Sequence, residues 1–142
     1  MTDGKRELLL DTHVLIWMVE ADPRLSEAMK NRLRQGSRES RLVVSAITPW
    51  EIALLVAKNR LKLRSDIQAW IDEALALPGI RLEPLSPSIA VASTRLPWEM
   101  HGDPADRILA ATARHLGATL ITADEQLLQF GAEGNLRVMA AR

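Results

Sequence analysis

The sequence contains no cysteine, carries no net charge and has no long apolar run, and each absence excludes a class of protein. Without cysteine among its 142 residues, the chain can form no disulfide, no thiolate nucleophile and no cysteine-ligated zinc site. Its 18 basic and 18 acidic residues cancel, so no general basic field attracts a polyanion. A nucleic acid would therefore have to be bound through a local patch or through a bound cation.

Signals for a membrane or for export are also missing. No apolar segment approaches the roughly 20 residues of a membrane span, and residues 1–7 lack the apolar core of a signal peptide. We therefore expect a cytoplasmic protein without membrane contact. The composition, 47% hydrophobic and 25% charged, is that of an ordinary globular chain, and the length fits one domain over residues 1–142.

Short apolar segments alternate with segments of helical length along the chain. The expected strands cover residues 7–11, 41–45, 80–85, 117–122 and 136–139. The expected helices cover residues 24–35, 49–61, 65–77, 87–95 and 105–116, with one more directly after the first strand and a short one over 125–130. This alternation is typical of βαβ units, which build a mainly parallel sheet with helices on both faces. The sequence therefore predicts a three-layer α/β/α fold.

Four acidic residues from separate parts of the sequence lie where strands end or helices begin. Asp11 ends the first strand, Glu51 and Asp106 lie in the first turns of helices, and Asp124 follows the fourth strand. Because the carboxyl ends of parallel strands meet at one edge of a sheet, these side chains are expected at the same edge. Clustered carboxylates repel one another unless they bind a cation or take up protons. Oxygen ligands suit Mg²⁺ or Mn²⁺, which would support metal-assisted hydrolysis of a phosphodiester.

Most of these acids also have a purely structural explanation. Thr48 followed by Glu51 has the form of a capping box, Asp103 would cap the helix that follows it, and Asp124 would cap the short helix after it. Such caps stabilise a helix by about 1 kcal/mol without any further function. Asp11 has no such explanation, because it ends a buried strand. A non-catalytic interaction domain whose acids are helix caps therefore remains the alternative.

Four blocks of the sequence match the pattern of one family when they are taken together. They are LLDTHVLIW at residues 9–17, SAITPWEIA at 45–53, DPADRILAATA at 103–113 and LITAD at 120–124. In content and order they resemble the PIN-domain ribonucleases, specifically the VapC-type toxins of bacterial toxin–antitoxin modules. The resemblance implies a PIN-like fold with a five-stranded sheet, a homodimer, and RNA cleavage with Mg²⁺ or Mn²⁺. It also implies an antitoxin protein whose tail blocks the acidic site, so we expect a metal-dependent endoribonuclease that acts as a toxin.

The resemblance assigns roles to individual residues. The residues that match the family's acidic quartet, and are therefore the expected catalytic residues and metal ligands, are Asp11, Glu51, Asp106 and Asp124. Thr12 and Thr122 match hydroxyl residues beside the first and last of these acids. Asp103 matches an acid common among the VapC-type proteins, which we interpret as a helix cap, with a supporting role around the metal ligands as the alternative. Arg107, beside the third acid, could pair with a carboxylate or a phosphate.

A few further residues are interpreted without reference to the acidic site. The histidines lack partners at the spacing of a helical metal site, so packing or surface roles are expected for His13, His101 and His115. Trp17 and Trp98 are interpreted as core residues, with anchoring of an interface as the alternative. The helix around residues 50–57 is apolar on nearly every side, so another element or a partner must cover it.

Overall fold

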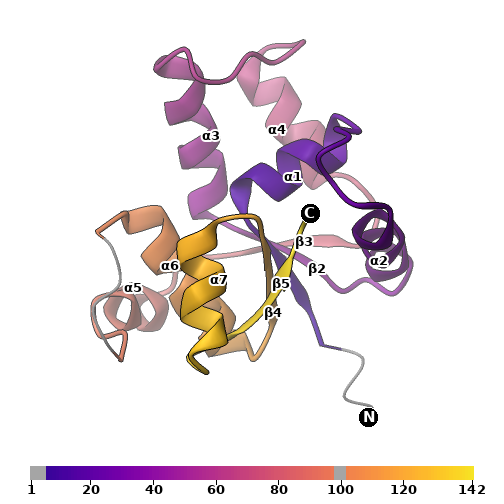
Figure 1. Ribbon diagram of the computed structural model, residues 1–142. Coiled ribbons are helices and arrows are strands. Elements are labelled where there is room, and N and C mark those ends of the chain that lie inside the picture. Colours follow the sequence, from indigo (N-terminus) through magenta and orange to yellow (C-terminus); the bar gives the residue numbers. More distant parts are fainter. Residues whose placement is uncertain (1–5, 98–101) are drawn as a thin grey trace.

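The computed structural model describes residues 6–97 and 102–142, which form the expected alternation of strands and helices (Figure 1). The strands are β1 (Leu8–Leu10), β2 (Leu42–Ser45), β3 (Ile80–Glu83), β4 (Thr119–Thr122) and β5 (Arg137–Ala140). The helices are α1 (Thr12–Val19), α2 (Glu27–Arg38), α3 (Ile47–Ala57), α4 (Ile67–Leu75), α5 (Pro87–Ser93), α6 (Pro104–Leu116) and α7 (Glu125–Ala132). Trp98 and His101, which the sequence singled out, lie outside the described residues.

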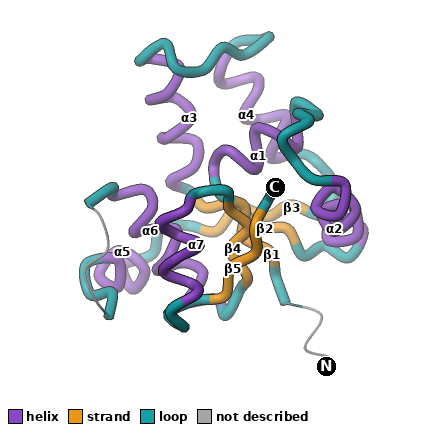
Figure 2. Tube along the Cα trace, viewed as in Figure 1, coloured by secondary structure: helices purple, strands orange, loops and turns teal. Residues whose placement is uncertain are grey.

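The five strands form one sheet in the order β3-β2-β1-β4-β5, and every neighbouring pair is parallel. The prediction of a five-stranded α/β fold is therefore confirmed, and the sheet is parallel throughout. The chain builds outward from β1 to β3 and then crosses to the other side of β1 to place β4 and β5 (Figure 2). The strand order therefore reverses between β1 and β4, and the carboxyl ends of strands at such a reversal are where open α/β sheets bind ligands.

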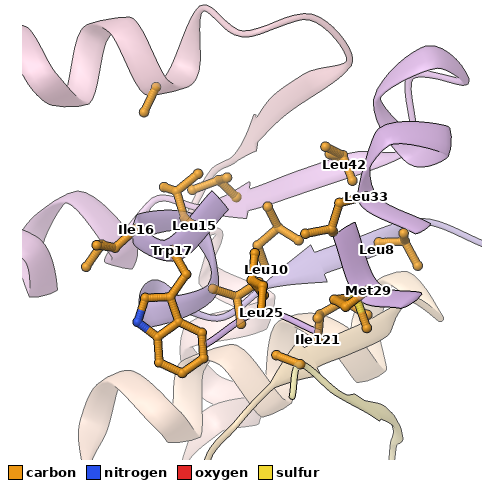
Figure 3. Packing of buried hydrophobic residues seen from close by; sticks show 14 of the residues in the cluster. Leu8, Leu10, Leu15, Ile16, Trp17, Leu25, Met29, Leu33, Leu42 and Ile121 are labelled. Atoms are coloured by element: carbon orange, nitrogen blue, oxygen red, sulfur yellow. The ribbon is translucent and has the colours of Figure 1, made fainter. Parts of the chain in front are cut away.

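Side chains of alternating direction on the central strands divide the core into two layers. Leu8 and Leu10 of β1 face one side, where they pack with residues of α1, α2 and α4, as Figure 3 shows for Trp17. Leu9 faces the opposite side, where it packs with α6 and α7 and with Phe130 in particular. A strand places successive side chains on opposite faces, so a fully buried strand has to be apolar at every position. The run of three leucines in β1 is therefore the signature of a central strand.

The start of α3 differs from the prediction. The helix begins at Ile47, and its N-cap is Ala46, which makes no side-chain cap hydrogen bond. The predicted capping role of Thr48 is therefore wrong, since Thr48 lies inside the first turn and is fully buried. The misleading signal was Pro49: proline is tolerated throughout a first turn, whose N–H groups have no intrahelical acceptor, and it need not be the first helical residue.

Neighbouring helices cover part of the apolar helix α3. It contacts α1, α4 and α6, and Ile52 is buried in these contacts. Trp50, however, remains 50% exposed, so the expectation that another element covers the helix holds for only part of its surface. None of the described helices combines the length and the apolar character that crossing a membrane requires.

Candidate active site

The four acids singled out from the sequence line one cleft, which has a volume of about 290 Å³. The cleft lies at the carboxyl edge of the sheet, next to the reversal between β1 and β4. Its wall is formed by Asp11, His13, Trp17, Glu51, Asp103, Asp106, Ala123, Asp124 and Arg142. Five of these nine residues are acidic, so the cleft is a concentrated negative site on a chain without net charge.

Asp11 and Asp124 are joined at the strand reversal by the hydroxyl of Thr122. The Thr122 hydroxyl donates to Asp11 Oδ2 over 2.6 Å and accepts from the Asp124 backbone N–H over 3.0 Å. The pairing of Leu10 with Ile121 places Asp11 opposite Thr122. Thr122 is fully buried, so this bridge is protected from water.

Asp11 also caps α1, a role that the sequence did not reveal. Its Oδ1 accepts from the Thr12 backbone N–H over 2.7 Å, and the helix starts at the next residue. The expectation that Asp11 has no capping role is therefore wrong. The reason is that Asp11 alone separates the end of β1 at Leu10 from the start of α1 at Thr12, so the residue that follows the strand is also the N-cap of the helix.

Glu51 is held by the side chain of Thr12. The Thr12 hydroxyl donates to Glu51 Oε1 over 2.5 Å and lies 3.5 Å from the hydroxyl of Thr48. Both threonines are fully buried and belong to different helices, α1 and α3. Glu51 is therefore positioned by tertiary contacts, and it is not part of a capping box.

Asp103 caps α6 as predicted and also lies among the acids. Its Oδ1 accepts from the backbone N–H groups of Ala105 over 2.9 Å and Asp106 over 3.4 Å. Carboxylate oxygens of Glu51, Asp103 and Asp106 all lie within 4.8 Å of one another. In the described part of the chain, this compact group includes Asp103 but neither Asp11 nor Asp124. The sequence signal for Asp103 was its place one turn before Asp106, at the start of the same helix.

Burial and mutual repulsion make it costly to ionise this cluster. Burial first, and then the repulsion from the neighbouring carboxylates of Asp103 and Asp11, raises the pKa of Asp106 to about 8. Burial also raises the pKa of Asp11 and of Glu51, against the lowering effect of the threonine hydrogen bonds. A bound cation would offset these costs. The donor set consists of carboxylate oxygens, which fits Mg²⁺ or Mn²⁺.

Basic residues near the acids include two that the sequence singled out, Arg107 and His13, and one that it did not, Arg142. Arg107 Nε donates to the backbone carbonyl of Ser93 over 3.0 Å, and Arg107 is not part of the cleft wall. His13 is exposed and lines the cleft. Arg142 lines it too, although sequence reasoning missed it. The signal was available, because Arg142 follows the fifth strand and therefore belongs to the same sheet edge as the acids.

Thr122→Val is expected to destabilise the protein by about 1–3 kcal/mol, because it leaves Asp11 and the Asp124 N–H without their buried partner. Thr122→Ser keeps the hydroxyl and should recover most of that loss. Urea unfolding at neutral pH measures the difference, with Thr119→Val in the same strand as the control. Equal losses for the two valine variants would contradict the importance of the bridge.

The fold and the cleft together define a class: three-layer α/β proteins with a carboxylate-lined site at the reversal of a parallel sheet. The chain belongs to the PIN domain family, whose model matches residues 8–133. It is similar to Ribonuclease VapC22 of Mycobacterium tuberculosis, with 33% identity over 120 residues that cover 84% of this chain and 88% of the relative. The predicted resemblance to VapC-type PIN proteins is thereby confirmed.

Solved structures of VapBC complexes share the fold. One is VapBC2 from Rickettsia felis bound to a DNA fragment from their promoter, with a TM-score of 0.71, 19% identity, and coverage of 95% of this chain and 98% of that chain. Another is DNA-bound VapBC from Salmonella typhimurium, with a TM-score of 0.68, 18% identity, and coverage of 96% and 99%. At these identities the likeness shows the fold alone.

Proposed function

We propose that this chain is a metal-dependent endoribonuclease that hydrolyses RNA phosphodiester bonds with Mg²⁺ or Mn²⁺ and acts as the toxin of a toxin–antitoxin pair. The observation that carries the proposal is the compact group of Glu51, Asp103 and Asp106, with further acids on the same cleft wall. Membership of the PIN domain family and the similarity to a ribonuclease support a nuclease activity.

In this proposal the catalytic residues and cation ligands are Asp11, Glu51, Asp106 and Asp124, and Asp103 adds a fifth carboxylate. A bound divalent cation would supply an activated water and neutralise charge on the phosphodiester. The protein's own contribution is to hold the carboxylates in place. Thr122 fixes Asp11 and Thr12 fixes Glu51, so neither acid has to reorient when the cation and the substrate arrive.

A non-catalytic interaction domain is the second candidate, and one observation favours it. Asp11, Asp103 and Asp124 each cap a helix, which would account for all three without any chemistry. Glu51 and Asp106 resist this explanation. Glu51 accepts from a side chain of another helix, and Asp106 is buried with a pKa of about 8. A domain that needed only helix caps would be more stable with neutral residues at both positions.

Glu51→Gln is expected to lower RNA cleavage by about 100-fold or more, a loss typical of removing a group that acts in the transition state. The measurement is cleavage of total cellular RNA by the purified, partner-free protein with Mg²⁺ or Mn²⁺ and with EDTA. Glu51 is a better target than Asp11, because Asp11 accepts through both carboxylate oxygens, from the Thr12 N–H and the Thr122 hydroxyl, and asparagine would keep only one of these acceptors. Glu73→Gln, an exposed acid on α4, is the matched control.

Discrete RNA fragments that vanish with EDTA and with Glu51→Gln, but persist with Glu73→Gln, are the expected result. The catalytic proposal fails if the folded, cation-loaded wild type cuts nothing that Glu51→Gln leaves intact. The interaction domain would then be the better account.

We further propose two protein partners, a cognate antitoxin and a second copy of the chain. The similar solved structures are VapBC complexes, which supports the first. The half-exposed Trp50 on the apolar helix α3 offers contact area for either partner. Since the proposed substrate is cellular RNA, we place the protein in the cytoplasm.

A further inference from the structure

Among the described residues that line the acidic cleft, Arg142 is the one arginine or lysine. It directly follows Ala141, which comes after β5, and this end of the chain lies beside α1 (Figures 1 and 2). The preceding backbone is fixed on both sides. Ala141 N–H donates to the Thr122 carbonyl over 2.9 Å, and the Ala141 carbonyl accepts from Ser26 N–H over 3.2 Å. The Arg142 side chain therefore starts from a defined point next to the acids.

The guanidinium group of Arg142 lies over the ring of Trp17, with its central carbon 5.6 Å from the ring centroid. Trp17 is only 5% exposed and is packed in the core, so it is a rigid platform. A guanidinium attracted to the face of a ring can still donate its N–H groups to an oxygen ligand. Arg142 also makes no ion pair with any carboxylate of the described chain. The arrangement holds a positive group in place without neutralising it.

The other arginines nearby have their donors engaged elsewhere. Arg24 also lies over the Trp17 ring, at 4.8 Å, but it donates to both carboxylate oxygens of Asp22 over 3.0 and 2.8 Å. Arg24 is not part of the cleft wall. Arg107 donates to a backbone carbonyl of α5. Arg142 therefore differs from both arginines: its charge lies at the cleft, and its N–H groups do not make contacts like those of Arg24 with Asp22 or of Arg107 with the backbone.

A phosphodiester that approaches the cleft meets five carboxylates, which repel it. A cation held among the acids would act on the phosphate that reacts, whereas the next phosphate along the strand would still need a positive partner. An arginine fixed at the rim meets that need, because its planar group can donate two parallel hydrogen bonds to one phosphate.

We propose that Arg142, held over the Trp17 ring at the rim of the acidic cleft, binds a backbone phosphate of the RNA strand next to the bond that is cut. The inference rests on the proposed ribonuclease function and identifies how the strand would be placed across the site. Arg142 is a substrate-binding residue here and takes no part in the chemical step. It therefore acts on the affinity for RNA and on KM more than on kcat.

The test measures RNA binding separately from cleavage. A fluorescein-labelled single-stranded RNA is titrated with the Glu51→Gln protein in Mg²⁺, and binding is followed by fluorescence anisotropy at several salt concentrations. Introducing Arg142→Ala into the Glu51→Gln protein should weaken its binding to the RNA about 10-fold or more, as expected for the loss of a charged hydrogen-bond donor. The slope of log K against log salt should fall by about 0.7, the value for one phosphate contact on a single strand. Arg142→Lys should keep the slope and recover only part of the affinity.

Arg24→Ala is the matched control, because it removes a guanidinium from the same ring outside the cleft. It should change the affinity by less than about twofold. Circular dichroism and the Tm of each variant show that the fold is kept. The inference is overturned if Arg142→Ala and Arg24→Ala behave alike, or if the parent protein binds no RNA. Tighter RNA binding by Arg142→Ala would also overturn it, since Arg142 would then be an internal counterion of the acids.

The two proposals can fail independently. If the wild type never cuts RNA but Arg142→Ala still weakens binding, the ribonuclease proposal fails and the phosphate contact stands. If the wild type cuts RNA while Arg142→Ala changes neither the affinity nor KM, the contact fails and the ribonuclease stands.

Discussion

Asp106→Asn is expected to abolish RNA cleavage while making the cation-free protein more stable. Burial and the neighbouring carboxylates raise the pKa of Asp106 from 3.8 to about 8. At a pH between these two pKa values the carboxyl group must take up a proton when the chain folds. At a higher pH it must be buried in its charged form. Either process costs free energy. Asparagine has nearly the same shape and has neither cost, so the free energy of unfolding should rise by about 1–3 kcal/mol.

The opposite signs of the two effects make this variant informative. Neutralising an acid with a structural role makes the protein less stable. Neutralising an acid that is kept for function lowers the activity and makes the protein more stable. We expect cleavage to fall by about 100-fold or more. Urea unfolding in EDTA and RNA cleavage in Mg²⁺ measure the two quantities on the same preparations.

Glu27→Gln is the control for the helix position of Asp106, because Glu27 is an exposed acid in the first turn of α2. Neutralising Glu27 should destabilise the protein slightly, by about 0.3–1 kcal/mol, through the lost interactions with the helix dipole and with Lys30. If Asp106→Asn destabilises the protein as Glu27→Gln does, Asp106 is a helix-terminal acid and nothing more. If it stabilises the protein but leaves cleavage intact, Asp106 is not a ligand of the catalytic cation.

The sequence could place the acids at one edge of the sheet because that step depends only on strand direction. Asp11 and Asp124 follow strands, and Asp106 lies in the first turn of a helix, so a parallel sheet brings them to the same side whatever its strand order. Their convergence into one cleft needed the order itself. Once β1 is known to pair with β4 through Leu10 and Ile121, the contact of Asp11 with Thr122 follows from the register.

The remaining features of the site depend on where helices start and how side chains turn. The support of Glu51 by Thr12 requires α3 to begin at Ile47, which no cap residue signals. Asp103 could be recognised as a cap, but its distance to Glu51 joins two helices whose relative position is a tertiary property. The contact of the Arg142 guanidinium with the Trp17 ring likewise joins two distant segments. Periodicity and capping patterns contain no information of this kind.

A saturating divalent cation is expected to stabilise the folded protein, and the gain is expected to grow as the pH rises. Without a cation, the folded state holds the proton of Asp106 up to a pKa of about 8, whereas the unfolded state releases it near 3.8. Between these values the folded state binds more protons, so the free energy of unfolding falls as the pH rises. A cation that binds the ionised acids competes with that proton, and its benefit is therefore largest at the alkaline end.

Thermal unfolding followed by circular dichroism across this pH range, in EDTA and in excess Mg²⁺ or Mn²⁺, measures the effect. A cation present at 100 times its Kd stabilises the folded state by about 2.7 kcal/mol, which corresponds to a rise in Tm of roughly 5–15 °C for a chain of this size. Asp72→Asn, an exposed acid on α4, should respond to the cation as the wild type does.

The Asp106→Asn protein should lose most of the rise in Tm that the cation causes, and its stability should fall less as the pH rises. One substitution removes both the cation ligand and the titrating group. This pairing separates a specific site from general screening of an acidic surface, which would shift the Tm of wild type, Asp72→Asn and Asp106→Asn alike. A wild type whose Tm does not respond to either cation at the alkaline end would remove the physical basis for a metal-dependent nuclease. The acids that cap helices would then be explained by a non-catalytic interaction domain. The buried carboxyl group of Asp106 would need a partner of another kind.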